Sequence, residues 1–148
     1  MLWIAVAFVA ALVSIFAVLK FRKAKDAREL AENSVDADGL RRLLDPDPRV
    51  LLIDVRQPLD LLAYSEMIPG AKRIPPKQLM ADPNLLPSDV DVVMYCTCEA
   101  QKTSLEIVRH ARMLGYKRLK VLRGGLAGWK AKGYPVAVYR ESFRLDTV

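Results

Sequence analysis

The stretch VVMYCTCEAQKTSLEIVRHARML, residues 92–114, passes from an apolar run to a polar loop and then to an amphipathic helix. Residues 90–95 have the length and composition of one buried strand. The sequence from Thr103 to Glu106 matches a capping box, and Gly115 is placed to end the helix. An apolar face recurs at helical spacing between them, at Ile107, Val108, Ala111 and Leu114. A strand, a loop and a helix in this order predict an α/β unit.

Strands and helices are expected to alternate along the rest of the chain. Apolar runs at residues 50–53 and 119–122 predict buried strands, and a brief strand is expected near Arg73, closed by Pro75 and Pro76. Helices are expected after the N-cap candidates at residues 36–38, ending at residues 45–48, and also over residues 58–64 and 126–132. This alternation predicts an α/β fold with a mainly parallel sheet flanked by helices.

The N-terminus carries a long uncharged segment. In residues 2–19, LWIAVAFVAALVSIFAVL, Ser14 is the one clearly polar side chain. A helix of this length covers most of a hydrocarbon core of roughly 30 Å. We therefore expect residues 1–19 to form a transmembrane anchor. A cleaved signal peptide is the less favoured alternative, because no cation precedes the apolar run and no small-x-small site ends it.

Positive charge follows that segment directly, at Lys20, Arg22, Lys23 and Lys25. Such cations resist translocation, so we expect a single-pass protein with its N-terminus outside and its domain in the cytoplasm, at a bacterial inner membrane. Residues 20–33 then form a basic, largely helical linker, residues 34–140 one domain and residues 141–148 a tail. The net charge of +6 is largely local to this run, which predicts contact with membrane lipid and argues against a nucleic-acid partner.

The sequence contains two cysteines, Cys96 and Cys98, which are too close together to staple distant parts of a fold. We expect reduced thiols. Ligands bind beyond the carboxyl ends of parallel strands, and the amides and dipole of the following helix would stabilise a thiolate or a persulfide there. Alternatively, a cysteine ending a buried strand is a small hydrophobe. Against that alternative stand the many polar residues of the loop, Thr97, Glu99, Gln101, Lys102, Thr103 and Ser104.

Four motifs, in order, resemble the rhodanese family: LIDVR at residues 52–56, IPGA at 68–71, VVMYC at 92–96, and LRGGLAGW at 122–129 with GYPV at 133–136. The resemblance covers about residues 34–138. It implies a sulfurtransferase in which a cysteine thiolate accepts sulfane sulfur as a persulfide and passes it to a nucleophile. The implied donor is thiosulfate or a persulfide, the acceptor is a thiol or a protein, and no metal or other cofactor is required.

The resemblance also assigns the site. Counting from the strand makes Cys96 the nucleophile, whereas counting back from Gly115 points to Cys98. We favour Cys96, with two loop residues inserted, and keep Cys98 as an alternative nucleophile or a resolving thiol. The expected substrate-binding residues are Thr97, Cys98, Glu99, Ala100, Gln101, Lys102, Thr103 and Ser104.

Three charged residues are expected to support this loop. Asp54 and Arg56 should pair with each other or with the backbone, and Arg123 should approach the loop from the last strand. His110, in the middle of a helix, is assigned a structural role.

The loop departs from the family, which usually has a shorter loop with Gly and Arg, and a His where Met67 stands. Lys102 is the loop's only cation. Its ammonium is a point charge, whereas the arginine usual in the family has a guanidinium that can make two parallel hydrogen bonds to an anion. Glu99 would raise the pKa of nearby thiols and oppose an anionic donor. A persulfide donor therefore fits this loop as well as thiosulfate does.

Other functions stay open. Because the usual loop Gly and Arg are missing, the domain could be a non-catalytic module that recruits a partner to the membrane. Binding of Cu(I) or Zn(II) by Cys-x-Cys is less favoured, since two ligands are too few for a closed zinc site. A phosphatase would need an arginine where Thr103 stands.

Overall fold

The structure is a computed structural model that describes residues 2–45, 50–97 and 102–140, without the side chains of residues 2 and 4–6. It separates into two compact units, Met1–Glu32 and Asn33–Val148. The expected helix end at residues 46–48 and the tail at residues 141–148 lie outside the described residues.

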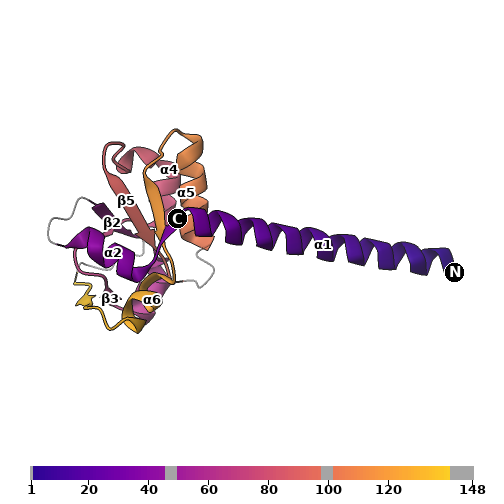
Figure 1. Ribbon diagram of the computed structural model, residues 1–148, viewed down its shortest axis with the longest axis horizontal. Coiled ribbons are helices and arrows are strands. Elements are labelled where there is room, and N and C mark those ends of the chain that lie inside the picture. Colours follow the sequence, from indigo (N-terminus) through magenta and orange to yellow (C-terminus); the bar gives the residue numbers. More distant parts are fainter. Residues whose placement is uncertain (1, 46–49, 98–101, 141–148) are drawn as a thin grey trace. The chain divides into compact units, whose positions relative to one another are not determined.

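The first unit is the single helix α1 (Leu2–Glu32), which continues through the basic run without a break (Figure 1). Along residues 3–21 its described large apolar side chains are exposed: Trp3, Phe8, Val9, Leu12, Val13, Ile15, Phe16, Val18, Leu19 and Phe21. Ser14 Oγ donates a hydrogen bond to the carbonyl of Ala10, so its hydroxyl is satisfied within the helix. Within the described residues, no helix is long and apolar enough to cross a membrane.

The second unit is built on a five-stranded parallel sheet with the order β1-β6-β5-β2-β4. The strands are β1 (Ser34–Val35), β2 (Val50–Asp54), β4 (Lys72–Arg73), β5 (Asp91–Tyr95) and β6 (Leu119–Leu122). The predicted mainly parallel sheet is confirmed. The register places Asp54 beside Tyr95, so both residues lie at the carboxyl edge of the sheet.

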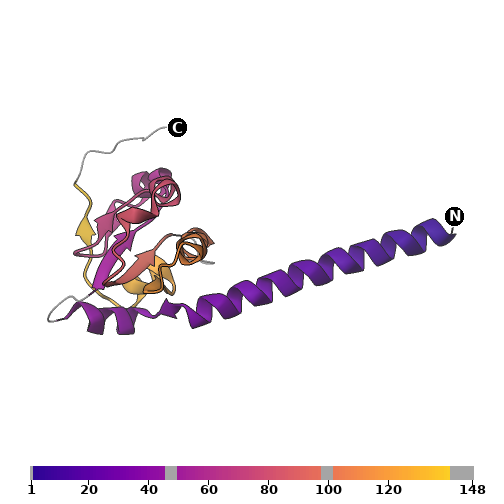
Figure 2. The same ribbon diagram turned by 90° about the horizontal axis from the view of Figure 1, so that it is seen from above.

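Helices cover both faces of this sheet (Figures 1 and 2). On one face, α2 (Ala37–Leu44) and α6 (Gly125–Ala131) pack on a buried cluster that contains Leu40, Leu52, Tyr95 and Trp129. On the other face, α4 (Pro76–Ala81) packs against α5 (Lys102–Met113). The unit also contains the short helix α3 (Pro58–Ala63) and the 3-10 helix η1 (Pro83–Leu85).

The closing motif brings two backbone segments close together. Gly124 has φ of +78°, and a Cβ built on it would lie 3.1 Å from the Cα of Gly128. The Gly128 N–H donates to the Gly124 carbonyl at 2.8 Å. Trp129 then packs with its ring centroid 4.8 Å from that of Tyr134, and its Nε1 donates to the Pro135 carbonyl at 2.8 Å. A Cβ built on Gly128 would in turn lie 3.1 Å from the Arg123 carbonyl oxygen, so both positions leave little room for a side chain.

Several short elements differ from the sequence-based expectations. The antiparallel pair β3 (Glu66–Met67) and β7 (Ala137–Val138) was not predicted. Pro76 does not close a strand but is the first residue of α4. The capping box at Thr103 is wrong, because α5 already begins at Lys102 and Thr103 lies in its first turn.

Candidate functional site

Cys96 directly follows the last residue of β5, at the carboxyl edge of the sheet. It is present as a thiol, and only 2% of its surface is exposed. The strand brings it there because Val92, Val93 and Met94 are all buried and hold β5 between its neighbours β2 and β6. Four of the predicted loop residues, Cys98, Glu99, Ala100 and Gln101, lie outside the described residues.

The described ends of this loop carry two buried hydroxyl oxygens. Thr97 Oγ1 and Ser104 Oγ are both buried, and within the described part of the chain neither has a hydrogen-bond partner. Ser104 is in the first turn of α5 with none of its surface exposed. A buried unsatisfied hydroxyl costs about 1–3 kcal/mol, so such groups often mark a place where water or a ligand completes the bonding.

The other two predicted loop residues line the start of α5. Lys102 is exposed and Thr103 is half-buried. A helix of this length presents unpaired amides and a partial positive charge at its N-terminus. Together with the Lys102 ammonium, this end of α5 favours a negatively charged group near the end of β5.

Asp54 and Arg56 form a fully buried ion pair at the same edge. Arg56 Nε lies 3.0 and 2.9 Å from the two carboxylate oxygens of Asp54, and Nη2 lies 2.6 Å from Oδ2. The backbone N–H of Arg56 also donates to Asp54 Oδ1. Arg56 Nη1 donates to the carbonyl of Tyr64, so the pair also holds the segment before β3. Both charges are compensated within this cluster.

Tyr95 completes the cluster, and the sequence did not single it out. Its hydroxyl donates to Asp54 Oδ2 at 2.9 Å and accepts from the Ile68 N–H at 3.2 Å. Burial, and next the negative charge of Asp54, raises the pKa of the Tyr95 hydroxyl well above its ordinary value, so the hydroxyl keeps its proton and acts as a donor. The Arg56 guanidinium carbon lies 5.8 Å from the Tyr95 ring centroid.

Arg73, on the edge strand β4, also reaches this cluster. Its Nη1 donates to the backbone carbonyl of Asp54 at 3.1 Å. Burial lowers the pKa of the Arg73 guanidinium, and the nearby Asp54 carboxylate opposes that effect. The sequence alone does not point to Tyr95 or Arg73 as members of this cluster, because neither belongs to a polar run. Only the register between the strands places them beside Asp54.

Arg123 is placed elsewhere than expected. Its guanidinium donates to Ser34 Oγ from both Nε and Nη2, at 3.2 and 3.0 Å. Ser34 is on β1, and β6 separates β1 from β5. Arg123 is thus engaged on the far side of β6 from Cys96. His110 is half-buried within α5, and Met67 lies in β3.

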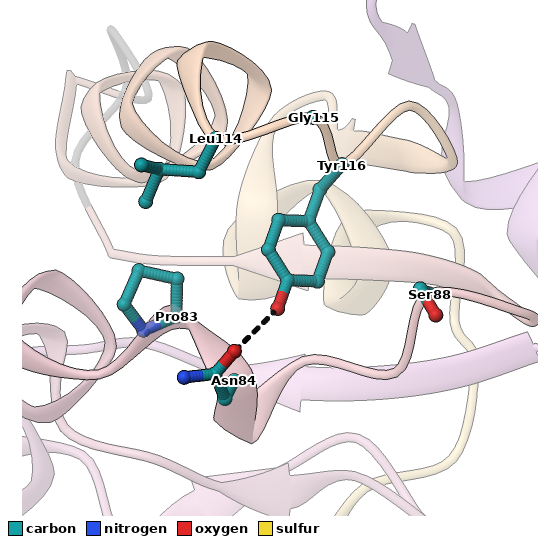
Figure 3. Close-up of a pocket in the computed structure, with 6 residues that line it drawn as sticks. All are labelled: Pro83, Asn84, Ser88, Leu114, Gly115 and Tyr116. Atoms are coloured by element: carbon teal, nitrogen blue, oxygen red, sulfur yellow. Dashed lines mark hydrogen bonds between the residues drawn. The ribbon is translucent and has the colours of Figure 1, made fainter.

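A hollow of about 380 Å³ lies at the opposite edge of the sheet, lined by Pro83, Asn84, Ser88, Leu114, Gly115 and Tyr116 (Figure 3). Ser88 precedes β5 and Tyr116 precedes β6, so the hollow is at the amino ends of these strands. Tyr116 donates its hydroxyl hydrogen to Asn84 Oδ1 at 3.3 Å. Over the described ranges, no three His, Cys, Asp or Glu side chains are grouped to hold a metal ion.

Comparison with known proteins gives consistent matches. A family model for the rhodanese-like domain matches residues 36–132. A sulfurtransferase from Allochromatium vinosum is 33% identical over 104 residues, which cover 70% of this chain and 94% of the relative. The crystal structure of a rhodanese-related protein from Thermoplasma volcanium matches with a TM-score of 0.60 at 25% identity, covering 71% of this chain and 97% of that one. A crystal structure from Anabaena sp. has the same TM-score at 29% identity, with 70% and 82% covered.

The matched residues include the motifs at residues 52–56, 68–71, 92–96 and 122–129, which the structure places around one parallel sheet. They span well over half of the chain. The family expected from those motifs is thereby confirmed, and the chain belongs to the rhodanese-like domain family.

Proposed function

We propose that this protein is a sulfurtransferase that carries sulfane sulfur as a persulfide on Cys96. The observation that carries the proposal is the position of this cysteine, as a thiol at the carboxyl end of the central strand β5, just before the loop that leads to α5. In parallel α/β sheets this is the edge where ligands bind. Family membership and the sulfurtransferase from Allochromatium vinosum support the same reaction.

With thiosulfate as donor, the Cys96 thiolate attacks the sulfane sulfur. A sulfur–sulfur bond to Cys96 forms, the bond between the two donor sulfurs breaks, and sulfite leaves with the electron pair. An acceptor thiolate then attacks the outer sulfur of the persulfide, which releases the Cys96 thiolate unchanged. A low-molecular-weight or protein persulfide can replace thiosulfate, and a thiolate is then the leaving group.

The surroundings of Cys96 suit an anion. The N-terminus of α5 and Lys102 provide positive potential, and the unsatisfied hydroxyls of Thr97 and Ser104 provide donors that the described residues do not use. Such donors would stabilise a thiolate, a persulfide or the oxygens of a sulfonate group. Cys98 stays the alternative nucleophile.

The test is mass spectrometry of the full-length protein after incubation with thiosulfate or with a low-molecular-weight persulfide. We expect Cys96 to gain the mass of one sulfur atom, and the gain to be lost on treatment with a thiol. Cys96→Ser should abolish the gain and Cys98→Ser should retain it. The reverse pattern would transfer the role to Cys98, and no gain with either donor would refute sulfur transfer.

We also propose that α1 anchors the domain at the cytoplasmic face of a membrane. Residues 2–19 carry no charge, the described large apolar side chains of residues 3–21 are exposed, and a run of cations follows directly after residue 19. Lipid would cover this apolar surface, and the cations would lie among headgroups. Sulfur delivered by this protein would then be released close to the bilayer.

A second candidate is a non-catalytic module that recruits a partner to the membrane. The low exposure of Cys96 and the engagement of Arg123 by Ser34 favour it, because neither feature helps to capture a small anionic donor. Replacing both cysteines with serine separates the two functions. A double variant that keeps full activity in cells would support the binding module, whereas loss of activity with the fold intact would support sulfur transfer.

A further inference from the structure

We propose that the Tyr95 hydroxyl is a positioning group for the neighbouring Cys96, holding the nucleophile in register with the amino end of α5. The inference rests on the proposed function, because it assigns Tyr95 a role in loading sulfur onto Cys96. It goes beyond that function by naming a residue that contacts neither donor nor acceptor.

Tyr95 is fixed at both ends. Its backbone carbonyl accepts a hydrogen bond from the Val55 N–H at 3.0 Å, which ties the peptide that leads into Cys96 to the segment after β2. Its hydroxyl is held by the Asp54 carboxylate and by the Ile68 N–H. None of the Tyr95 surface is exposed. The residue before the nucleophile therefore has no freedom to shift without breaking a buried hydrogen bond.

The hydroxyl also links parts of the fold that backbone pairing leaves separate. Ile68 follows β3, which pairs with β7 in a two-stranded sheet outside the main one. The buried hydrogen bond from the Ile68 N–H to the Tyr95 hydroxyl and the partly buried one from Arg56 Nη1 to the Tyr64 carbonyl tie this segment to the end of β5 and to the residues after β2. Since Arg56 and the Tyr95 hydroxyl both also donate to the Asp54 carboxylate, these contacts join the carboxyl edge next to Cys96 into one cross-linked unit.

Loss of this one hydroxyl would affect two buried groups together. The Ile68 N–H would lose its acceptor, and the Asp54 carboxylate would lose one of its donors. Buried polar groups without partners draw the structure into rearrangement, because their desolvation is no longer compensated. Because Tyr95 directly precedes Cys96, such a rearrangement at position 95 would act on the peptide that carries the nucleophile.

A matched control is available at the other edge of the sheet. Tyr116 also makes a side-chain hydrogen bond through its hydroxyl, to Asn84, but it lies at the amino ends of the strands (Figure 3). Tyr95→Phe and Tyr116→Phe each remove one phenolic oxygen. Only the first is expected to change the chemistry of Cys96.

Both substitutions are made in the full-length protein carrying Cys98→Ser, so that one thiol reports. At saturating thiosulfate, Tyr95→Phe should slow single-turnover persulfide loading by about tenfold, with the half-saturating concentration changed less than about twofold, because small misplacements of a nucleophile act on the chemical step. In Tyr95→Phe, the pH profile of alkylation by iodoacetamide should show a higher Cys96 pKa than in the parent protein. The end of a helix stabilises a thiolate only at short range, so a displaced thiol would lose part of that stabilisation. Tyr116→Phe should match the parent in both measurements.

The proposal is overturned if Tyr95→Phe loads sulfur and titrates like Tyr116→Phe. If the parent protein loads no sulfur at all, the proposed function fails, while the alkylation profiles still decide whether Tyr95 positions the thiol. If Tyr95→Phe does not fold, a variant with 4-aminophenylalanine at position 95 tests the proposal instead, because its amino group keeps a hydrogen-bond donor for Asp54. A folded 4-amino protein should load sulfur within about threefold of the parent rate, and a loss as large as the tenfold above would refute the role of the donor.

Discussion

Arg56 and Asp54 lie side by side with no exposed surface on either side chain, and their shortest contact is 2.6 Å from Nη2 to Oδ2. An isolated buried charge is costly, so each of these residues depends on the other. This arrangement gives the carboxyl edge its rigidity and makes it vulnerable to single substitutions.

Replacing Arg56 with methionine should destabilise the protein by about 3–5 kcal/mol, because it leaves the Asp54 carboxylate buried without its cation. Urea unfolding followed by circular dichroism would measure the loss. Arg118→Met is the control, since its partner Asp91 is about half exposed and that ion pair is screened by solvent. Equal losses for the two variants would show that burial does not govern the Arg56 pair.

Gly124 should tolerate alanine less well than Gly70 does. Both glycines have positive φ, +78° and +80°, so both substitutions carry a similar backbone strain of about 1–2 kcal/mol. A Cβ at position 124 would in addition lie 3.1 Å from the Gly128 Cα, whereas a Cβ at position 70 would have no described atom within 4 Å beyond the adjacent residues. The difference in unfolding free energy between the two variants measures the cost of the contact between a Cβ at position 124 and the Gly128 Cα. A zero difference would show that α6 can move away from that Cβ with no loss of stability.

The sequence predicts the long strands of the sheet well, but it predicts the short elements and part of the candidate site poorly. The runs that became β2, β5 and β6 were located to within one residue, because buried parallel strands are continuous apolar segments. Two-residue strands such as β3 and β7 carry no periodicity, and Pro76 could equally end one element or begin the next. At the site, the ordered motifs pointed to Cys96 and to the Asp54–Arg56 pair. The role of Tyr95 depends on residues 27 and 41 positions away along the chain, which only the register brings together.

Asp38 should give the protein a pH dependence in acid. Hydrogen bonds from Lys132 and from Tyr134, in that order, lower its pKa below the ordinary value of 3.8. A carboxyl whose pKa is lower in the folded state adds stability that is fully present above 3.8 and is lost as the pH falls through the folded pKa. Asp38→Asn should therefore be less stable than the wild type at neutral pH, and the two stability curves should converge below the folded pKa. If the difference in stability between Asp38→Asn and the wild type does not change as the pH falls through the folded pKa, the stabilisation by Asp38 does not come from its charge.

The proposed membrane anchor makes a prediction for cell fractionation. If α1 anchors the protein as proposed, the full-length protein should sediment with membranes and resist extraction by alkaline carbonate, because lipid would then cover the exposed apolar side chains of α1. A fragment of residues 26–148 keeps the whole second unit and should stay in the supernatant. Full-length protein with Leu12→Arg and Phe16→Arg is the matched control, since both side chains are exposed on α1 and a charge at the bilayer centre is costly. Recovery of the unmodified protein in the carbonate extract would argue against a spanning helix.

Ser104 offers the sharpest separation of stability from function. Its buried hydroxyl has no partner within the described residues, so Ser104→Ala should stabilise the unloaded protein, by up to about 1–3 kcal/mol, by removing an uncompensated polar group. If the hydroxyl serves the bound donor or the persulfide, the same change should slow sulfur loading several-fold. Thermal unfolding and single-turnover loading would be measured together, with Ser88→Ala, at an exposed position, as the control. A variant that is more stable and loads sulfur at the wild-type rate would show that the hydroxyl is merely tolerated, and anion binding at the start of α5 would then depend on the helix amides and Lys102 alone.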